Sequence, residues 1–302
     1  CLGFLSSFLS QHSRRPDMLS RCHHLGRTCR RVRKSRALSS TALGEKYNNF
    51  IFDCDGVLWN ASTPIAGSID AINALKAAGK TVVFVTNNAT KSRATYVAKF
   101  KELGFEGVNE SEINTSASAS ADYCRQQGYN KAFVIGEVGL REELMQQQVE
   151  VIWDEGCQGM SDDDFLEAIR QIDNNNGGGV DVVVVGWDKN FSYRKLCLAS
   201  LHLQVCIAMI NRVPEFMFIC FQTLYGQRGA QLVVTNPDSA DRMGGYLMPG
   251  TGCSAAAIQR ALESETLDVS VTVCGKPSQD LMDALLCKYG LDTEMTLMCG
   301  DR

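Results

Sequence analysis

Short runs of consecutive apolar residues alternate along the chain with stretches in which apolar residues recur at helical spacing. A continuous run rich in β-branched residues, such as Thr81–Val85, is typical of a parallel strand buried on both faces. Strands that alternate with helices predict an open, doubly wound parallel sheet of the α/β class. The predicted strands are Asn49–Phe52, Thr81–Val85, Lys131–Ile135, Val180–Val185, Val269–Cys274 and Thr296–Cys299.

Capping residues and glycines place helices between these strands. Ser68 predicts the N-cap of a helix that carries Ile72 and Leu75 and ends near Gly79. A helix late in the chain ends near Gly290.

Polar residues follow four of the predicted strands, at the point where each strand ends. Ligands of open α/β sheets bind at the carboxyl ends of the strands. We therefore expect the four clusters to form one site. They are Asp53 with Asp55, Thr86 with Asn87 and Asn88, Lys276, and Asp301.

The residue types in these clusters suit phosphoryl transfer. Carboxylates as close as Asp53 and Asp55 raise each other's pKa unless a cation compensates, and Mg²⁺ prefers oxygen ligands. A carboxylate beside such a cation can attack phosphorus and form an aspartyl phosphate. A Thr hydroxyl, backbone N–H groups and a Lys can donate to the equatorial oxygens. Each cluster alone is weak evidence, since an acidic pair after a strand is often a turn, so their joint order carries the prediction.

Four motifs resemble those of the haloacid dehalogenase superfamily, and the resemblance covers residues 48–302. They are Asp53–Leu58, Val85–Asn88, Gly275–Ser278 and Gly300–Arg302. More narrowly, the chain is similar to the phosphoglycolate, pyridoxal and 4-nitrophenyl phosphatase subgroup. The matching segments are Trp59, Asn88–Arg93, Thr235–Asp238 and Gly250–Gly252. The resemblance implies a Rossmann-like core with an inserted α/β cap domain of the C2 type.

The resemblance also implies a role for each cluster. Asp53 would be the nucleophile, and Asp55 would protonate the leaving group and then activate water. The phosphoryl group would be bound by Thr86, Asn87, Asn88 and Lys276. Mg²⁺ would be held by Asp53, by the carbonyl of Asp55 and by Asp301.

The implied activity is the hydrolysis of small phosphomonoesters, with 2-phosphoglycolate as the first choice of substrate. Pyridoxal phosphate, glycerol phosphate and 4-nitrophenyl phosphate are the alternatives. A phosphoacceptor signalling domain uses similar residues, but the long interval between Thr86 and Lys276 counts against it. A truncated, non-catalytic binding protein is the third hypothesis.

The same interval predicts the domain organisation. The separation along the sequence between Asp53 and Thr86 suits one strand–helix–strand crossover. The separation between Thr86 and Lys276 is far too long for one crossover and requires an inserted domain. We expect a core formed by residues 47–127 and 271–302 and a cap formed by residues 128–270. Such a lid excludes water and adds contacts remote from the phosphate.

The composition of residues 1–46 indicates a targeting leader. They carry ten Lys or Arg and two acids, and Arg- and Ser-rich, acid-poor composition is typical of a transit peptide. We expect an organellar location, chloroplast or mitochondrion, with a disordered basic tail on a cytoplasmic protein as the alternative.

Composition excludes several classes of function. The chain has a net charge of −4 in spite of its basic leader, which argues against nucleic acid as a partner. Thirteen cysteines without a CxxC pair fit reduced thiols, and the scarcity of histidine argues against a His-based site. We expect a small phosphomonoester substrate and no membrane partner, with a homodimer through the cap as a possibility.

Two segments depart from the family pattern. The family's last motif continues as Leu-x-Thr-Asp, so we expect the core to be C-terminally truncated after Arg302. Residues 205–228 interrupt a connection that is short in the family, and we interpret them as an aberrant insertion such as a translated intron. A real insertion could instead form a dimer or membrane contact. No apolar stretch in it approaches the about 20 residues that span a bilayer.

Overall fold

The computed structural model describes residues 42–153, 163, 166, 167, 170, 180–212, 231–243, 246–263 and 269–301. The expected leader lies outside these residues except for helix α2 (Ala42–Lys46). Helix α8 (Tyr193–Arg212) continues through the first positions of the 205–228 segment, and residues 213–228 lie outside the described part. Among the described helices, none is long and apolar enough to cross a membrane.

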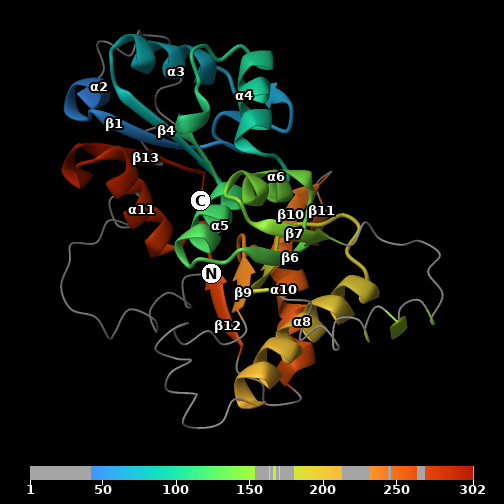
Figure 1. Cartoon of the computed structure of the whole chain (residues 1–302). Helices are drawn as coiled ribbons and strands as arrows, with labels where there is room; N and C mark the ends of the chain where they lie inside the picture. Colours follow the sequence, from blue (N-terminus) through green and yellow to red (C-terminus); the bar gives the residue numbers. More distant parts are fainter. Residues whose placement is uncertain are drawn as a thin grey trace, which may run out of the picture.

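The first of two parallel sheets occupies the upper lobe of Figure 1 and has the described strand order β13-β1-β4-β5. Its strands are β1 (Asn49–Asp53), β4 (Thr81–Thr86), β5 (Ile113–Thr115) and β13 (Thr296–Cys299). Helices α3 (Ser68–Ala77) and α4 (Arg93–Glu102) pack on one face, and α11 (Gln279–Tyr289) packs on the other. The central strands β1 and β4 are therefore buried on both faces, as their continuous apolar sequences predict.

The second sheet forms the lower lobe of Figure 1, with the described order β12-β9-β8-β6-β7, all parallel. Its strands are β6 (Lys131–Ile135), β7 (Glu150–Trp153), β8 (Val182–Val185), β9 (Gln231–Val234) and β12 (Ser270–Val273). One face is covered by α5 (Ser116–Gln126) and α6 (Val138–Gln146), and the other by α8 and α10 (Thr251–Glu263). The predicted fold class, a doubly wound core with an α/β cap, is confirmed.

Two antiparallel hairpins complete the described strands. The first joins β2 (Trp59–Asn60) to β3 (Thr63–Pro64), directly after the Asp53–Asp55 segment. The second joins β10 (Ala240–Met243) to β11 (Tyr246–Pro249) in the second lobe.

The expected domain limits fall close to elements that pack with the second sheet. Helix α5 precedes the limit at 127/128, yet it buries Ala117, Ala121 and Cys124 against that sheet. Strand β12 spans the limit at 270/271 and pairs with β9. Lys276 therefore follows a strand of the second sheet, whereas Asp53 and Thr86 end strands of the first sheet and Asp301 follows one.

Local capping agrees with the sequence in most places. Ser92 caps α4 and Ser278 caps α11, each through a side-chain bond to a backbone N–H, and Gly290 ends α11 in the left-handed conformation. The prediction for Ser68 is wrong, because Gly67 is the N-cap of α3. The Ser68 hydroxyl instead donates to the carbonyl of Leu58 at 2.9 Å, which ties the helix to the segment before it.

A buried ion pair joins the two lobes. Glu143 on α6 is fully buried and accepts hydrogen bonds from the backbone N–H of Arg93 (2.5 Å) and from Arg93 Nε (2.8 Å) at the start of α4. Beside it, Gly139 approaches the 90–92 loop so closely that a Cβ would lie 2.3 Å from the carbonyl carbon of Lys91. This contact holds the second lobe against the loop that follows β4.

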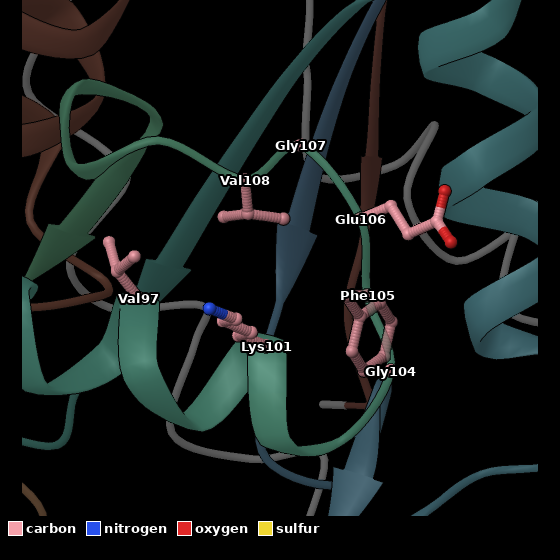
Figure 2. Close-up of a pocket in the computed structure, with 7 residues that line it drawn as sticks. All are labelled: Val97, Lys101, Gly104, Phe105, Glu106, Gly107 and Val108. Carbon is pink, nitrogen blue, oxygen red and sulfur yellow. The ribbon is translucent and has the colours of Figure 1, made fainter.

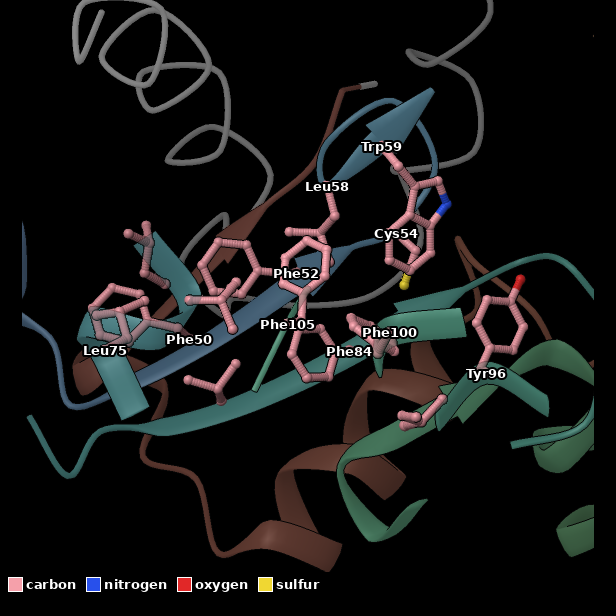
Figure 3. Close-up of a cluster of buried hydrophobic side chains, with 14 residues drawn as sticks. Phe50, Phe52, Cys54, Leu58, Trp59, Leu75, Phe84, Tyr96, Phe100 and Phe105 are labelled. Carbon is pink, nitrogen blue, oxygen red and sulfur yellow. The ribbon is translucent and has the colours of Figure 1, made fainter. Parts of the chain in front are cut away.

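An aromatic cluster fills the space between the first sheet and helices α3 and α4 (Figure 3). Trp59, Cys54 and Tyr96 lie at one end of this cluster, while Phe50 and Leu75 lie at the other. Each of these side chains is at most 3% exposed. The loop after β1 is therefore packed against the first lobe, since its residues Cys54 and Leu58 belong to this cluster.

Candidate active site

Asp53, the last residue of β1, forms an ion pair with Lys276. Lys276 Nζ lies 2.6 Å from Asp53 Oδ2, and both side chains are 16% exposed. The backbone N–H of Cys54 donates to the other carboxylate oxygen of Asp53 at 2.8 Å. Burial raises the pKa of Asp53 above its usual value, and the charge of Lys276 opposes this shift.

Asp55 lies exposed beside this pair and is held by two donors. The indole Nε1 of Trp59 donates to Asp55 Oδ1 at 2.8 Å, and the hydroxyl of Thr86 donates to Oδ2 at 3.3 Å. Thr86 is almost completely buried at the end of β4, and its hydroxyl oxygen accepts from the backbone N–H of Asn88. The predicted neighbours Asp55 and Thr86 are thus brought into direct contact.

Asn87 connects the two lobes at the site. Its Oδ1 accepts from the backbone N–H of Lys276 (2.7 Å), and its Nδ2 donates to the Lys276 carbonyl (2.9 Å) and to Asp238 Oδ2 (3.1 Å). Its own carbonyl accepts from Asn236 Nδ2 and from the hydroxyl of Ser116. The Asn87 side chain is therefore engaged between the two lobes, which leaves its backbone N–H as the donor that it could offer to a ligand.

The side chain of Asn88 shapes the loop that follows. Its Oδ1 accepts from the backbone N–H and the hydroxyl of Thr90, at 2.8 and 2.7 Å. This Asx-type turn leads the chain from β4 into α4. The side-chain oxygen of Asn88, one of the predicted binding residues, is therefore used to stabilise this turn.

Asp301 follows β13, which pairs with β1, and lies against the loop after Asp53. Gly56 has φ +81°, and a Cβ on it would lie 2.5 Å from Asp301 Oδ2. The charge of Asp301 also contributes to the raised pKa of Asp53. The predicted metal-binding carboxylates are thus neighbours across the carboxyl edge of the first sheet.

The residues at this edge fit a Mg²⁺ ion. They offer oxygen atoms from Asp53, Asp301 and the backbone of the loop, and the close approach of Asp301 to Gly56 leaves no room for a side chain there. Within the described ranges, no group of three or more His, Cys, Asp or Glu gathers as a metal cluster. Few protein ligands are typical of Mg²⁺, which keeps several waters.

Four residues of the site had no role predicted for them from the sequence: Trp59, Ser116, Asn236 and Asp238. Trp59 and the Thr235–Asp238 segment were recognised only as matches to the subgroup. Asn236 and Asp238 follow β9 just as the predicted clusters follow their strands, so position at a strand end was an available signal. Ser116 carries no comparable signal, because it begins a helix.

An open pocket of about 420 Å³ lies elsewhere, between α4 and the 104–108 loop (Figure 2). It lies at the C-terminal end of α4, whereas the N-terminal end of this helix follows the site. Its lining mixes apolar residues with Lys101 and Glu106. The pocket therefore belongs to the opposite edge of the first sheet and takes no part in the strand-end cluster.

Comparison with known proteins agrees with this geometry. A family profile described as haloacid dehalogenase-like hydrolase matches residues 50–150. The chain is 34% identical to glycerol-3-phosphate phosphatase of Homo sapiens over 91% of this chain and 78% of the relative. It is 34% identical to phosphoglycolate phosphatase 2 of Arabidopsis thaliana over 86% of this chain and 78% of the relative. The structure of a p-nitrophenyl phosphatase from Archaeoglobus fulgidus aligns with a TM-score of 0.60 at 26% identity, covering 83% of this chain and 77% of that one.

Proposed function

Since the chain belongs to the haloacid dehalogenase-like hydrolases and is a phosphoric monoester hydrolase, we propose that it acts through an aspartyl phosphate on Asp53, with 2-phosphoglycolate as its main substrate. The observation that most supports the mechanism is the ion pair between Asp53 and Lys276, in which an ammonium group lies 2.6 Å from the carboxylate. The similarity to phosphoglycolate phosphatase 2 supports the choice of substrate.

In the first step, an Asp53 carboxylate oxygen attacks the phosphorus, and the bond from phosphorus to the ester oxygen breaks. The ester oxygen takes a proton from the carboxyl group of Asp55 and leaves as an alcohol. The hydroxyl of Thr86, the backbone N–H of Asn87 and the ammonium of Lys276 donate to the three remaining phosphoryl oxygens.

In the second step, water attacks the aspartyl phosphate and Asp55 takes the proton of that water. The acyl–phosphate linkage breaks, so Asp53 is regenerated as a carboxylate and inorganic phosphate leaves. Asp55 then holds the proton for the next cycle, because acid and base roles alternate on one group. Mg²⁺ held by Asp53, the Asp55 carbonyl and Asp301 would supply positive charge to the phosphoryl oxygens when bound.

Glycerol 3-phosphate is the second candidate substrate, because the alignment with human glycerol-3-phosphate phosphatase covers 91% of this chain. The residues of the first lobe that handle the phosphoryl group serve either substrate equally. The preference between the two esters must therefore be set by contacts to the leaving group, which bears a carboxylate in 2-phosphoglycolate and a diol in glycerol 3-phosphate. These contacts come from residues outside the group that binds the phosphoryl oxygens.

The experiment is a comparison of kcat/KM for 2-phosphoglycolate, glycerol 3-phosphate, pyridoxal phosphate and 4-nitrophenyl phosphate with the full chain and Mg²⁺. We expect the highest value for 2-phosphoglycolate, and a higher value for another ester would replace it as the substrate. Asp53→Asn is expected to abolish turnover while the thermal unfolding temperature stays near that of the wild type. Retained turnover in a folded Asp53→Asn protein would overturn the mechanism.

A further inference from the structure

The indole of Trp59 reaches the site from the core of the first lobe. Trp59 is 0% exposed, and its Nε1 donates to Asp55 Oδ1 at 2.8 Å. A buried indole N–H needs an acceptor, and here the acceptor is an exposed carboxylate at the mouth of the site. One side chain thus connects the packed core with the group that faces the ligand.

The ring of Trp59 is held on several sides by side chains from α4 and the loop after it. Phe100 and Phe105 meet it edge to face, with centroids 4.9 and 6.0 Å away, and Tyr96 stacks at 6.4 Å. Lys99 Nζ lies 4.1 Å from the centroid of the ring. Figure 3 shows Trp59 and Tyr96 at the same end of the aromatic cluster. An indole packed in this way has few alternative orientations, so its N–H direction is fixed.

The backbone of the same segment is tied as tightly. The N–H of Gly56 donates to the Trp59 carbonyl at 2.8 Å, and the N–H of Trp59 donates to the Cys54 carbonyl at 3.3 Å. Asp55 therefore sits in a short loop closed by backbone bonds. Its carboxylate is held on one side by Trp59 at 2.8 Å and on the other by Thr86 at the longer distance of 3.3 Å.

We propose that Trp59 is a positioning residue for proton transfer: its indole N–H holds Asp55 Oδ1, so that Oδ2 carries the proton to the leaving oxygen. Oδ1 accepts the short bond from the indole N–H and is therefore the poorer site for a proton. Oδ2 accepts only the longer bond from the Thr86 hydroxyl, which in the proposed mechanism turns to the phosphoryl group when the ester binds. In the first step the Oδ2–H bond breaks as the ester oxygen gains the proton, and Oδ1 keeps its bond from Trp59. This inference rests on the acid–base role proposed for Asp55.

The experiment compares Trp59→Phe with the wild type on two esters in Mg²⁺. The 4-nitrophenolate leaving group departs without a proton, whereas the alkoxide of glycerol 3-phosphate requires one. General acid catalysis contributes about 10²–10⁴-fold, so we expect kcat/KM for glycerol 3-phosphate to fall by about 10- to 100-fold. For 4-nitrophenyl phosphate we expect a change of less than about 3-fold, because its departure does not use the Asp55 proton.

Phe105→Leu is the matched control, because Phe105 packs on the Trp59 ring at 6.0 Å and does not bond Asp55. We expect it to change kcat/KM for both esters by the same factor. Equal changes for both esters in Trp59→Phe would show that Trp59 only packs the core and would overturn the proposal. If the wild type hydrolyses 2-phosphoglycolate but not glycerol 3-phosphate, 2-phosphoglycolate replaces it as the alkyl ester, and a wild-type protein that hydrolyses none of the three esters would instead refute the proposed function.

A second variant covers the case in which Trp59→Phe does not fold. Benzothienylalanine incorporated at position 59 keeps the shape of the bicyclic ring and replaces the N–H by sulfur, so it removes only the donor. The expected result is the same selective loss on glycerol 3-phosphate. An unchanged ratio of the two kcat/KM values in this variant would overturn the proposal without any question of folding.

Discussion

Asn87 and Lys276 are joined by two hydrogen bonds that run in opposite directions. The Lys276 N–H donates to Asn87 Oδ1 at 2.7 Å, and Asn87 Nδ2 donates to the Lys276 carbonyl at 2.9 Å. The two residues follow strands of different sheets, β4 and β12. The two bonds therefore hold Lys276, which belongs to the second lobe, against the carboxyl edge of the first sheet.

Asn87→Ala is expected to lower kcat by about 10- to 100-fold. Each lost hydrogen bond is worth about 0.5–1.5 kcal/mol, and about 1.4 kcal/mol corresponds to a tenfold change in rate. The measurement is steady-state kinetics together with thermal unfolding. Asn130→Ala serves as control, because the side chain of Asn130 donates only to the exposed Gly128 carbonyl. Wild-type kinetics in Asn87→Ala would contradict the positioning of Lys276 by Asn87.

Glu143→Ala is expected to destabilise the protein by about 3–5 kcal/mol, because it removes the buried partner of the largely buried Arg93 guanidinium and leaves only the exposed Glu110 near it. The measurement is urea unfolding at neutral pH. Glu110→Ala is the control, since Glu110 is 46% exposed and lies 4.0 Å from the same Arg93. Exposed pairs contribute about 0–1 kcal/mol, so similar losses in the two variants would show that the ion pair between α4 and α6 is unimportant.

Native alkylation is expected to separate two groups of cysteines. Burial raises the pKa of Cys124 to about 12 and that of Cys274 to about 11, and it raises the pKa of Cys54 well above its usual value. At pH 8 these thiols stay protonated and unreactive, because the thiolate is the nucleophile. Iodoacetamide followed by mass spectrometry should label the exposed Cys253 and Cys287 first. In urea all five should react, and native labelling of Cys54 would refute its burial.

Metal removal is expected to abolish turnover, and added Mg²⁺ should restore it. Asp301→Asn removes the charge of a proposed Mg²⁺ ligand, so we expect half-maximal activity to require a Mg²⁺ concentration at least about tenfold higher, or about 1.4 kcal/mol. Asp283→Asn, on the exposed surface of α11, should leave the Mg²⁺ dependence unchanged. Turnover that persists in EDTA, or an Asp301→Asn protein with wild-type Mg²⁺ dependence, would contradict the assigned ligands.

Much of the fold could be predicted because burial on both faces leaves a direct trace in the sequence. The runs at Thr81–Val85 and Lys131–Ile135 are strands β4 and β6, with few differences at their ends. The capping prediction failed at Ser68, because Gly67 in the left-handed conformation begins the helix and the hydroxyl serves a distant carbonyl. A hydroxyl near a helix start has several acceptors, and the sequence does not rank them.

From the sequence alone, Asp53, Asp55, Thr86 and Asp301 could be placed at one site, because polar groups at the ends of apolar parallel strands gather at one edge of the sheet. The three-dimensional structure was needed to show that β12 joins the second sheet, so that Lys276 reaches Asp53 from the opposite lobe. It alone also paired Asn87 with Lys276 across 189 positions, and Trp59 with Asp55. An apolar run shows that a segment is buried but not against which partner, since many partners of similar hydrophobicity compete and the packing of the whole chain selects among them.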